Sequence, residues 1–143
     1  MNFSFAQTFD EIKVSAEQGD ANAQHRLGGL FTTGKGATLD QKQALYWFTK
    51  SAEQENVKAQ FNLGTMYRTG TGVITDHKQA LYWYKKSASQ GDTYAQYIIG
   101  VMCCNGEGTP ADKKQAASWI KLSSESGNES AKSLWGKYEL HKY

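Results

Sequence analysis

Apolar residues recur along this chain with the spacing of one helix face. In residues 44–54 they stand at positions i, i+3, i+4, i+7 and i+8, which predicts an α-helix packed on one side. A similar stripe in residues 20–33 predicts another helix before it. Since no segment alternates polar and apolar residues at period two for long, we predict an all-α fold. The two stripes consist of Ala44, Trp47, Phe48, Ser51 and Ala52, and of Ala23, Leu27, Leu30 and Phe31.

This pair of helices is repeated at a fixed interval. Trp47, Trp83 and Trp119 are 36 residues apart, and a period of this length is typical of stacked supersecondary units. We therefore predict about eight helices in antiparallel pairs, and we call the first helix of each pair A and the second B. The expected units are an N-terminal capping helix in 1–18, full repeats at 19–54, 55–90 and 91–126, and a C-terminal capping helix in 127–143.

Capping residues mark the expected helix ends. Each B helix follows an aspartate that has a glutamine three residues later, the pattern of a capping box, and Ser4 with Gln7 repeats it for the first helix. Each A helix follows Asp or Asn and ends at a glycine suited to the left-handed conformation that closes helices. The expected B caps are Asp40, Asp76 and Asp112, the A caps are Asp20, Asn56 and Asp92, and the A helices end at Gly34, Gly70 and Gly106.

Glycine also returns in the middle of every A helix, at Gly28, Gly64, Gly100 and Gly136. A glycine in a helix interior costs about 1 kcal/mol relative to alanine. Because this loss of helix stability recurs in every repeat, we expect tight packing to require the glycine. We therefore expect a neighbouring helix to approach each of these glycines too closely for a side chain.

The second repeat shows the pattern most completely. Its residues are Ala59, Leu63, Gly64, Tyr67, Gly70, Gly72, Val73, Asp76, Ala80, Trp83, Tyr84, Lys86, Ser87 and Ala88. With this pattern the chain resembles the Sel-one-like repeat family, relatives of the tetratricopeptide repeat; the first copy departs at Ala37 and the third at Cys103 and Thr109. The resemblance implies a right-handed α/α superhelix, or solenoid, that serves as an adaptor or scaffold, often in bacterial signalling, stress or toxin-related systems. The resemblance implies no catalytic residue.

Composition narrows the function classes. The net charge of +2 over 143 residues is too small to select nucleic acid as a partner. Neither residues 1–18 nor any later segment has the apolar run of a signal peptide or a membrane span. Cys103 and Cys104 are adjacent and poorly placed to pair with each other, which fits a reducing compartment. We expect a cytoplasmic protein if Met1 is the natural start, and a secreted or periplasmic one if a leader was removed.

No constellation of residues predicts an enzyme. His25, His77 and His141 share no metal-ligand spacing and are interpreted as surface side chains. Cys103 is expected to be buried and unreactive, since no cation or base is predicted beside it. We therefore expect no catalytic residue, no metal site and no cofactor.

The third A helix differs from the others because it is apolar almost all round, and such a helix is normally covered on both sides. In related superhelices the A helices line the concave wall. We therefore interpret the outward face of this helix, extended by Leu134 and Leu140, as an apolar floor that contacts a partner. Packing against the adjacent A helix is the alternative for Phe61 and Tyr97. The predicted partner-binding residues are Phe61, Tyr94, Tyr97, Ile98, Val101 and Cys104.

Three functions of different classes are compatible with this surface. The one we favour is a non-catalytic protein–protein interaction module whose concave groove holds a helix or an extended segment of a partner protein. The second is a homodimer through the apolar face of the third A helix. The third is a small-ligand-binding or enzymatic protein working from the groove, for which paired acids and a metal set are missing. Tyr46 and Tyr82 form a further candidate surface on the opposite face.

Overall fold

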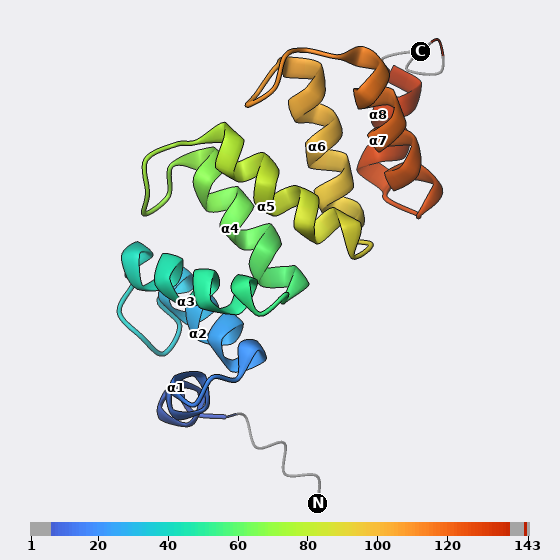
Figure 1. Ribbon diagram of the computed structural model, residues 1–143. Coiled ribbons are helices and arrows are strands. Elements are labelled where there is room, and N and C mark those ends of the chain that lie inside the picture. Colours follow the sequence, from blue (N-terminus) through green and yellow to red (C-terminus); the bar gives the residue numbers. More distant parts are fainter. Residues whose placement is uncertain (1–6, 138–141, 143) are drawn as a thin grey trace, which may run out of the picture.

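Eight α-helices and short loops make up the computed structural model, which describes residues 7–137 and 142 (Figure 1). No strand occurs among these residues, and the predicted all-α class is confirmed. None of the described helices combines the length and the apolar character needed to cross a bilayer. The helices are α1 (Phe9–Glu17), α2 (Ala21–Thr33), α3 (Gln41–Glu53), α4 (Val57–Thr69), α5 (His77–Ser89), α6 (Thr93–Asn105), α7 (Lys113–Glu125) and α8 (Glu129–Lys137).

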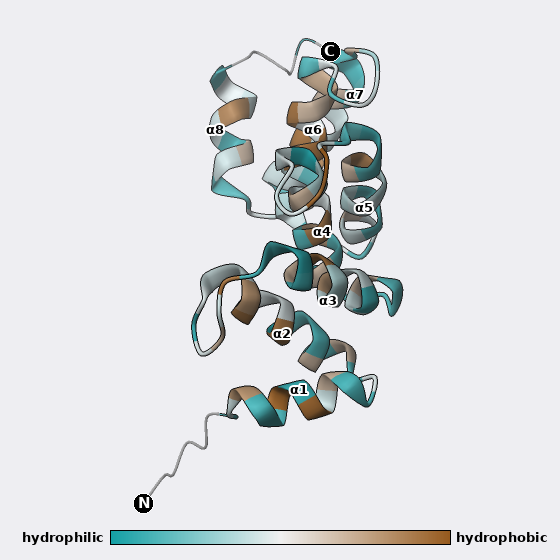
Figure 2. Ribbon diagram, turned by 90° about the vertical axis from the view of Figure 1, so that its left-hand side faces the viewer, coloured by the Kyte–Doolittle hydropathy of each residue, from teal (hydrophilic) through white to brown (hydrophobic). Residues whose placement is uncertain are grey.

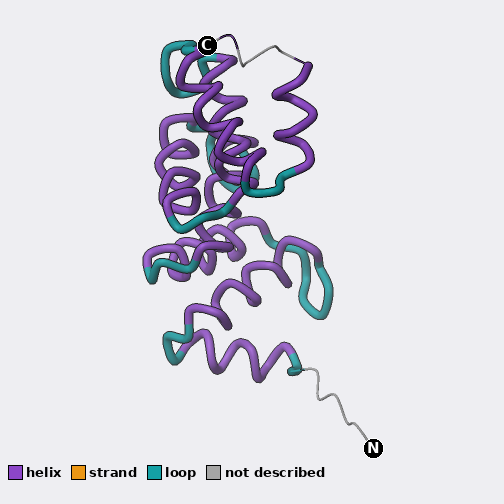
Figure 3. Tube along the Cα trace, turned by 90° about the vertical axis from the view of Figure 1, so that its right-hand side faces the viewer, coloured by secondary structure: helices purple, strands orange, loops and turns teal. Residues whose placement is uncertain are grey.

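Helices stack in chain order, so that each packs mainly on the helices directly before and after it. In Figure 2 the A helices α2, α4, α6 and α8 lie on one side of the stack, and the B helices α3, α5 and α7 lie on the other. Helices α2 and α8 project further than α4 and α6, which gives the A side a concave outline. Figure 3 shows the stack from the opposite side, with loops along its edges. This arrangement is the helical solenoid expected from the repeat.

The predicted ends of the A helices are confirmed. At the start of α2, the Asp20 carboxylate accepts a hydrogen bond from the amide of Ala23 at 2.6 Å. Asn56 and Asp92 cap α4 and α6 in the same way. The glycines that end these three helices have φ angles from 66° to 72°, in the left-handed region. Local sequence therefore determines both ends of α2, α4 and α6.

The capping boxes of the B helices are only half formed. Asp40 accepts hydrogen bonds from the amides of Lys42 and Gln43 at 3.0 and 3.1 Å, as predicted. The amide of Asp40, however, donates to the carbonyl of Phe31 in α2 and is not available to the Gln43 side chain. The equivalent bond recurs in the next two repeats. It ties the start of each B helix to its own A helix, a long-range contact that the capping pattern does not reveal.

The first helix begins later than predicted. Its N-cap is Thr8, which forms a complete capping box: the Thr8 hydroxyl accepts from the Glu11 amide, and the Glu11 carboxylate accepts from the Thr8 amide. Ser4, the predicted cap, lies outside the described residues. Helix α1 therefore has 9 residues where α3 has 13. Ile12 and Ala16 are its buried residues, as their alignment with Phe48 and Ala52 implies.

Mid-helix glycines have the predicted packing role in three of the four A helices. A Cβ atom on Gly64 would lie 2.9 Å from Cδ1 of Tyr84, so the Tyr84 ring rests directly on the α4 backbone. At Gly136 no atom of the described chain lies within 4 Å of such a Cβ, and the prediction of a close approach there is wrong. The other three glycines each meet the B helix that follows their own A helix, and no described helix follows α8. The packed pairs are Gly28 with Phe48, Gly64 with Tyr84, and Gly100 with Ile120.

Buried glutamines join successive repeats. Gln24, Gln60 and Gln96 each donate from Nε2 to a carbonyl near the end of the preceding helix. Two of them also accept from a second glutamine: Gln54 Nε2 donates to Gln24 Oε1 at 2.8 Å, and Gln90 Nε2 to Gln60 Oε1 at 2.9 Å. Both glutamines recur with the 36-residue period, which is the sequence signal of this ladder.

The third repeat breaks the glutamine ladder because Ser126 stands where Gln54 and Gln90 stand. Within the described part of the chain, Gln96 Oε1 is consequently buried without a hydrogen-bond partner. We expect Ser126→Gln to raise the free energy of unfolding by about 1 kcal/mol, the usual net contribution of one hydrogen bond. Urea unfolding measures the change, with Gln90→Ser as the reciprocal control that should lower stability. An unchanged urea midpoint for Ser126→Gln would show that the glutamine–glutamine hydrogen bonds add no stability.

Candidate functional site

Helix α6 carries most of the predicted partner-binding residues on the concave side. Tyr94, in its first turn, is 64% exposed, whereas Tyr97, Ile98, Val101 and Cys104 are half-buried. Ile98 and Cys104 pack against the core that α5 and α6 share. We call these five residues the α6 surface. Part of its apolar area contributes to the core, and part of it remains accessible.

Tyr97 lines a groove between α6 and α8. The groove has a volume of about 570 Å³, and its other lining residues are Leu134 and polar residues of α8. Tyr97 and Cys104 also pack against the small core formed by α7 and α8. The α6 surface is thus supported from the α7 side and open toward the groove. Leu140, predicted to extend this surface, lies outside the described residues.

Phe61 on α4 is mainly a packing residue. Its ring meets the Tyr84 ring at an interplanar angle of 62°, with centroids 5.5 Å apart. It is half-buried against the core shared by α5 and α6. The ring contact of Phe61 is therefore with α5, the B helix of its own repeat.

An ion pair just after the end of α6 connects the second and third repeats. Arg68 on α4 donates from Nε and Nη2 to the two carboxylate oxygens of Glu107, at 2.8 and 3.2 Å. These hydrogen bonds raise the pKa of Arg68 and lower the pKa of Glu107. The pair holds the α6–α7 loop on α4.

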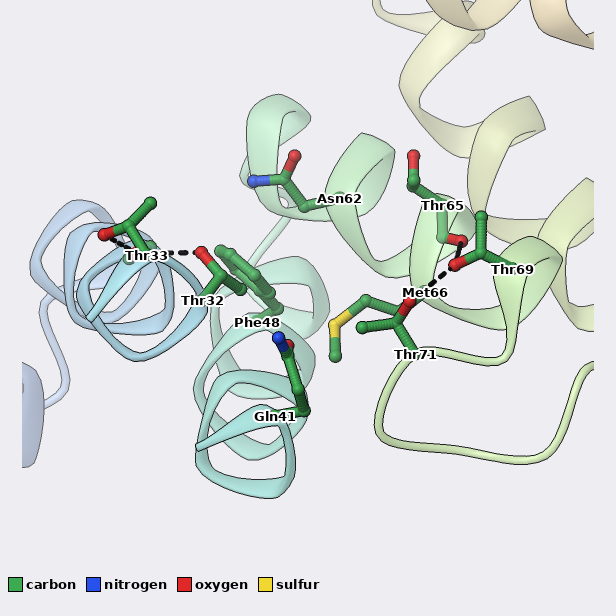
Figure 4. A pocket seen from close by; sticks show the side chains of 10 residues that line it. Thr32, Thr33, Gln41, Phe48, Asn62, Thr65, Met66, Thr69 and Thr71 are labelled. Atoms are coloured by element: carbon green, nitrogen blue, oxygen red, sulfur yellow. Dashed lines mark hydrogen bonds between the residues drawn. The ribbon is translucent and has the colours of Figure 1, made fainter. Parts of the chain in front are cut away.

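A second hollow lies nearer the N-terminal end of the concave wall, between α2, α3 and α4 (Figure 4). We call it the Gly29 pocket, and its volume is about 280 Å³. In Figure 4 the Gln41 side chain rises from α3 between the two A helices, beside Phe48. None of the lining residues is charged. Most are polar, and they include Thr32, Thr33, Gln41, Asn62 and Thr69.

None of the predicted site residues lines the Gly29 pocket. The sequence signal that could have found it is Gly29, which follows the recurring Gly28 but does not itself recur. Thr65 and Val101 hold the equivalent positions in the next two repeats. Recognition of the pocket also required the tertiary structure, because its walls come from three helices.

His25 is half-buried, so its interpretation as a surface side chain is wrong. Its ring lies 5.7 Å from the Phe48 ring, and Nε2 is 3.2 Å from the Asn62 amide nitrogen. Burial is the larger cause that lowers the pKa of His25, and the positive charge of Lys58 adds to it. His25 therefore packs against Phe48 and Asn62, and its lowered pKa favours the neutral imidazole.

The cysteines and possible metal ligands show no reactive arrangement. Cys103 is buried, as predicted, and neither Cys103 nor Cys104 forms a disulfide. Burial raises the pKa of both thiols, which lowers the fraction of nucleophilic thiolate. Among the described residues there is no group of three or more His, Cys, Asp or Glu side chains that could hold a metal ion.

The opposite face carries Tyr46 and Tyr82, which are 50% and 52% exposed. Each packs edge-on against the tryptophan that follows it, with ring centroids 4.9 and 5.0 Å apart. A lysine four residues later lies over each tyrosine ring, at 5.2 and 5.9 Å. About half of each tyrosine remains exposed beyond these contacts, so the surface stays a further candidate.

Each full repeat of this structure also matches a known family. Sel1 repeats are identified at residues 21–56, 57–92 and 93–128, and each contains one A helix and the B helix that follows it. The chain belongs to the Sel1 repeat family. Sel1 repeat proteins generally mediate protein–protein interactions and are typically non-catalytic. A comparison with curated proteins gave no match.

Solved Sel1 repeat structures are similar to most of this chain. A protective antigen present in uropathogenic Escherichia coli strains is 39% identical, with a TM-score of 0.86 over 88% of this chain and 27% of that one. A Sel1 repeat protein from Oxalobacter formigenes is 32% identical, with a TM-score of 0.86 over 90% of this chain and 53% of that one. This Sel1 repeat chain thus spans 27% and 53% of the length of these two relatives.

A more distant structure shares the fold alone. Cysteine rich protein B from Helicobacter pylori is 21% identical, with a TM-score of 0.69 over 90% of this chain and 98% of that one. The likeness confirms the helical solenoid and carries no residue-level information about a site.

Proposed function

We propose that this Sel1 repeat protein binds a segment of a partner protein along its concave wall, with the α6 surface as the main contact. Tyr94 and Tyr97 are the proposed anchors, and Ile98 and Val101 surround them. The observation that carries the proposal is Tyr94, a large aromatic side chain that is 64% exposed on a helix whose other outward residues are also apolar. Tyrosine is enriched among the residues that dominate binding energy at interfaces.

The groove between α6 and α8 supports this assignment. Its lining combines Tyr97 and Leu134 with the charged residues Glu129 and Lys137. An apolar centre bordered by polar residues is the usual composition of a protein interface. A segment seated here would bury the exposed part of the α6 surface. The setting that the family resemblance suggests is an adaptor in a bacterial signalling, stress or toxin-neutralising system.

The proposal is tested by capturing a partner from the native lysate with the tagged protein and repeating the capture with variants. We expect the double variant Tyr97→Ala with Val101→Asp to lower the affinity for that partner about thirtyfold or more, the loss typical of removed interface hot spots. Tyr94→Ala should weaken binding with no change in stability, because the Tyr94 side chain is mostly exposed. Tyr82→Ala, on the opposite face, serves as the matched control and should bind normally.

Circular dichroism and melting separate binding from folding. The double variant should keep its helical content and nearly its melting temperature; loss of the fold would show that the α6 surface is core. Normal binding by both Tyr94→Ala and the double variant would reject the proposal. A concentration-dependent dimer in ultracentrifugation that the double variant dissociates would support the homodimer instead.

A further inference from the structure

Three loops join an A helix to the B helix of the same repeat, and together they form one edge of the solenoid. They span residues 34–40, 70–76 and 106–112. In Figure 1 they project toward the left and upper left of the stack, one repeat after another. A Cβ on Gly108 would lie 2.5 Å from the His77 carbonyl oxygen, so the third loop rests on the first turn of α5; Gly72 places the second loop on α3 in the same way. We call the three loops, with the first turns of α3, α5 and α7, the loop edge.

The loop edge exposes an apolar side chain in each repeat. Ile74, in the second loop, is 89% exposed, the highest value among the exposed large apolar residues of the described chain. Leu39, in the first loop, is 58% exposed, and Pro110, in the third, is also exposed. None of the three belongs to a hydrophobic core cluster of the described residues. Isolated exposed apolar residues are common, but one in each of three adjoining loops indicates a contact surface.

Lysines accompany these apolar residues along the loop edge. Lys42, Lys78 and Lys114 are the second residues of α3, α5 and α7, and Lys35 lies in the first loop. All four are exposed, and none forms an ion pair within the described part of the chain. The helix dipole disfavours a cation in the first turn by about 0.3–1 kcal/mol. Lysine therefore recurs where it lowers helix stability, as expected of residues that serve a function.

The acidic residues of the loop edge are already engaged within the chain. Asp40, Asp76 and Asp112 each accept hydrogen bonds from two amides of the helix that they cap. Glu107 accepts from the Arg68 guanidinium through both carboxylate oxygens. The helix N-termini are therefore closed by the chain's own carboxylates. The positive charge that the edge offers to an external anion comes from the lysine side chains.

A bilayer that contains anionic lipids matches both features of the loop edge. Its headgroups carry negative charge and its acyl region begins just beneath them, so lysines can bind headgroups while neighbouring apolar side chains insert. A soluble polyanion would neutralise the lysines and leave Ile74 in water. An apolar protein surface would cover Ile74 and leave the lysines without anions. A lipid surface satisfies both groups, and it adapts to the shape of the loops.

We propose that the loop edge binds the surface of an anionic bilayer. Ile74 and Leu39 insert at the level of the headgroups, and the lysines at the starts of α3, α5 and α7 pair with lipid phosphates. The loop edge shares no residue with the α6 surface, so this inference goes beyond the proposed function and does not depend on it. A chain bound in this way keeps the α6 surface available to a partner protein.

Cosedimentation of the full chain with lipid vesicles tests the proposal. The probes are vesicles of phosphatidylcholine mixed with phosphatidylglycerol, and vesicles of phosphatidylcholine alone. We expect binding to the anionic vesicles at low ionic strength, a decrease as salt is added, and binding to phosphatidylcholine alone that is about tenfold weaker or more. Equal binding to the two kinds of vesicle, or no binding to the anionic ones, would overturn the proposal.

Two variants test the two parts of the surface. Ile74→Ser should weaken binding to the anionic vesicles about fivefold, because an inserted aliphatic side chain is lost. The double variant Lys42→Gln with Lys78→Gln should weaken it about twentyfold, since each lysine near an anionic surface contributes about fivefold. All three side chains are exposed, so the melting temperature should not change. Unaltered vesicle binding by either variant would overturn the proposal.

Matched controls lie at the opposite edge of the solenoid. Lys58→Gln removes the same charge from the second residue of α4, and Leu122→Ser removes an exposed aliphatic side chain from the last turn of α7. Both should bind the anionic vesicles normally. Losses as large as those of the loop-edge variants would assign the binding to overall charge or hydrophobicity and overturn the proposal. Tyr94→Ala should also bind vesicles normally, so a failure of the proposed function is distinguishable from a failure of the loop edge.

Discussion

Replacement of Gly108 by alanine is expected to lower the free energy of unfolding by about 3 kcal/mol. Gly108 has a φ of 71°, a conformation that costs an L-residue about 1–2 kcal/mol. The new Cβ would also lie 2.6 Å from the carbonyl carbon of His77, the first residue of α5. Because the obstacle is backbone, it cannot rotate aside as a side chain could, and its displacement adds about 1–3 kcal/mol. The melting temperature should fall by about 10 °C.

Gly91→Ala is the matched control for Gly108→Ala. Gly91 has a φ of 92°, but no atom lies within 4 Å of a Cβ built on it. It should therefore lose only the conformational part, about 1–2 kcal/mol. The difference between the two variants measures how tightly the α6–α7 loop rests on the start of α5. Equal losses would show that the loop can move away at little cost.

Tyr84→Ala is expected to destabilise the protein by about 4 kcal/mol, within the range of large aromatic residues removed from a core. Tyr84 is 1% exposed and lies on the backbone of Gly64. Its hydroxyl and the Thr65 hydroxyl are 2.9 Å apart, and its ring packs against Phe61. Loss of the ring would leave a cavity between α4 and α5, the two helices of the central repeat. Urea unfolding monitored by circular dichroism measures the loss.

Two further variants divide the effect of Tyr84. Tyr84→Phe removes only the hydroxyl and should cost about 1 kcal/mol; the first repeat has Phe48 at this position. Tyr82→Ala removes the same side chain two residues away, where it is 52% exposed, and should cost less than about 1 kcal/mol. A loss at Tyr82 comparable to that at Tyr84 would contradict the assignment of core and surface.

The 36-residue repeat predicted the secondary structure well, because the residues that mark helix ends act on nearby backbone groups. Aspartate, asparagine and glycine at the ends of the A helices act on amides and carbonyls a few residues away, and the structure confirms each of them. The same reasoning failed where a residue further away in the sequence competes for a capping amide. The Asp40 amide bonds to Phe31, and the capping pattern alone could not show that this carbonyl would be within reach.

The α6 surface was predicted from a different kind of signal, the excess of apolar residues over what one helix face needs. That signal identified Tyr94 and Tyr97 as unusual, but it could not divide the residues between core and groove. The division depends on α7 and α8, which cover Cys104 and part of Tyr97 and leave Tyr94 open. The Gly29 pocket escaped prediction because it is defined by a missing side chain, and periodic patterns report side chains that are present.

By itself, the sequence determined the all-α class, the 36-residue unit, the ends of α2, α4 and α6, and the family, because each of these follows from the kinds of residues found at fixed local spacings. The tertiary structure decided which glycines are packed, which buried amides find partners, and which apolar residues remain accessible. These properties depend on atoms brought together from different repeats, and small differences between repeats change them. Gly29, Thr65 and Val101 hold the same position in three helices, and Gly29, which has no side chain, lines a pocket between α2 and α4.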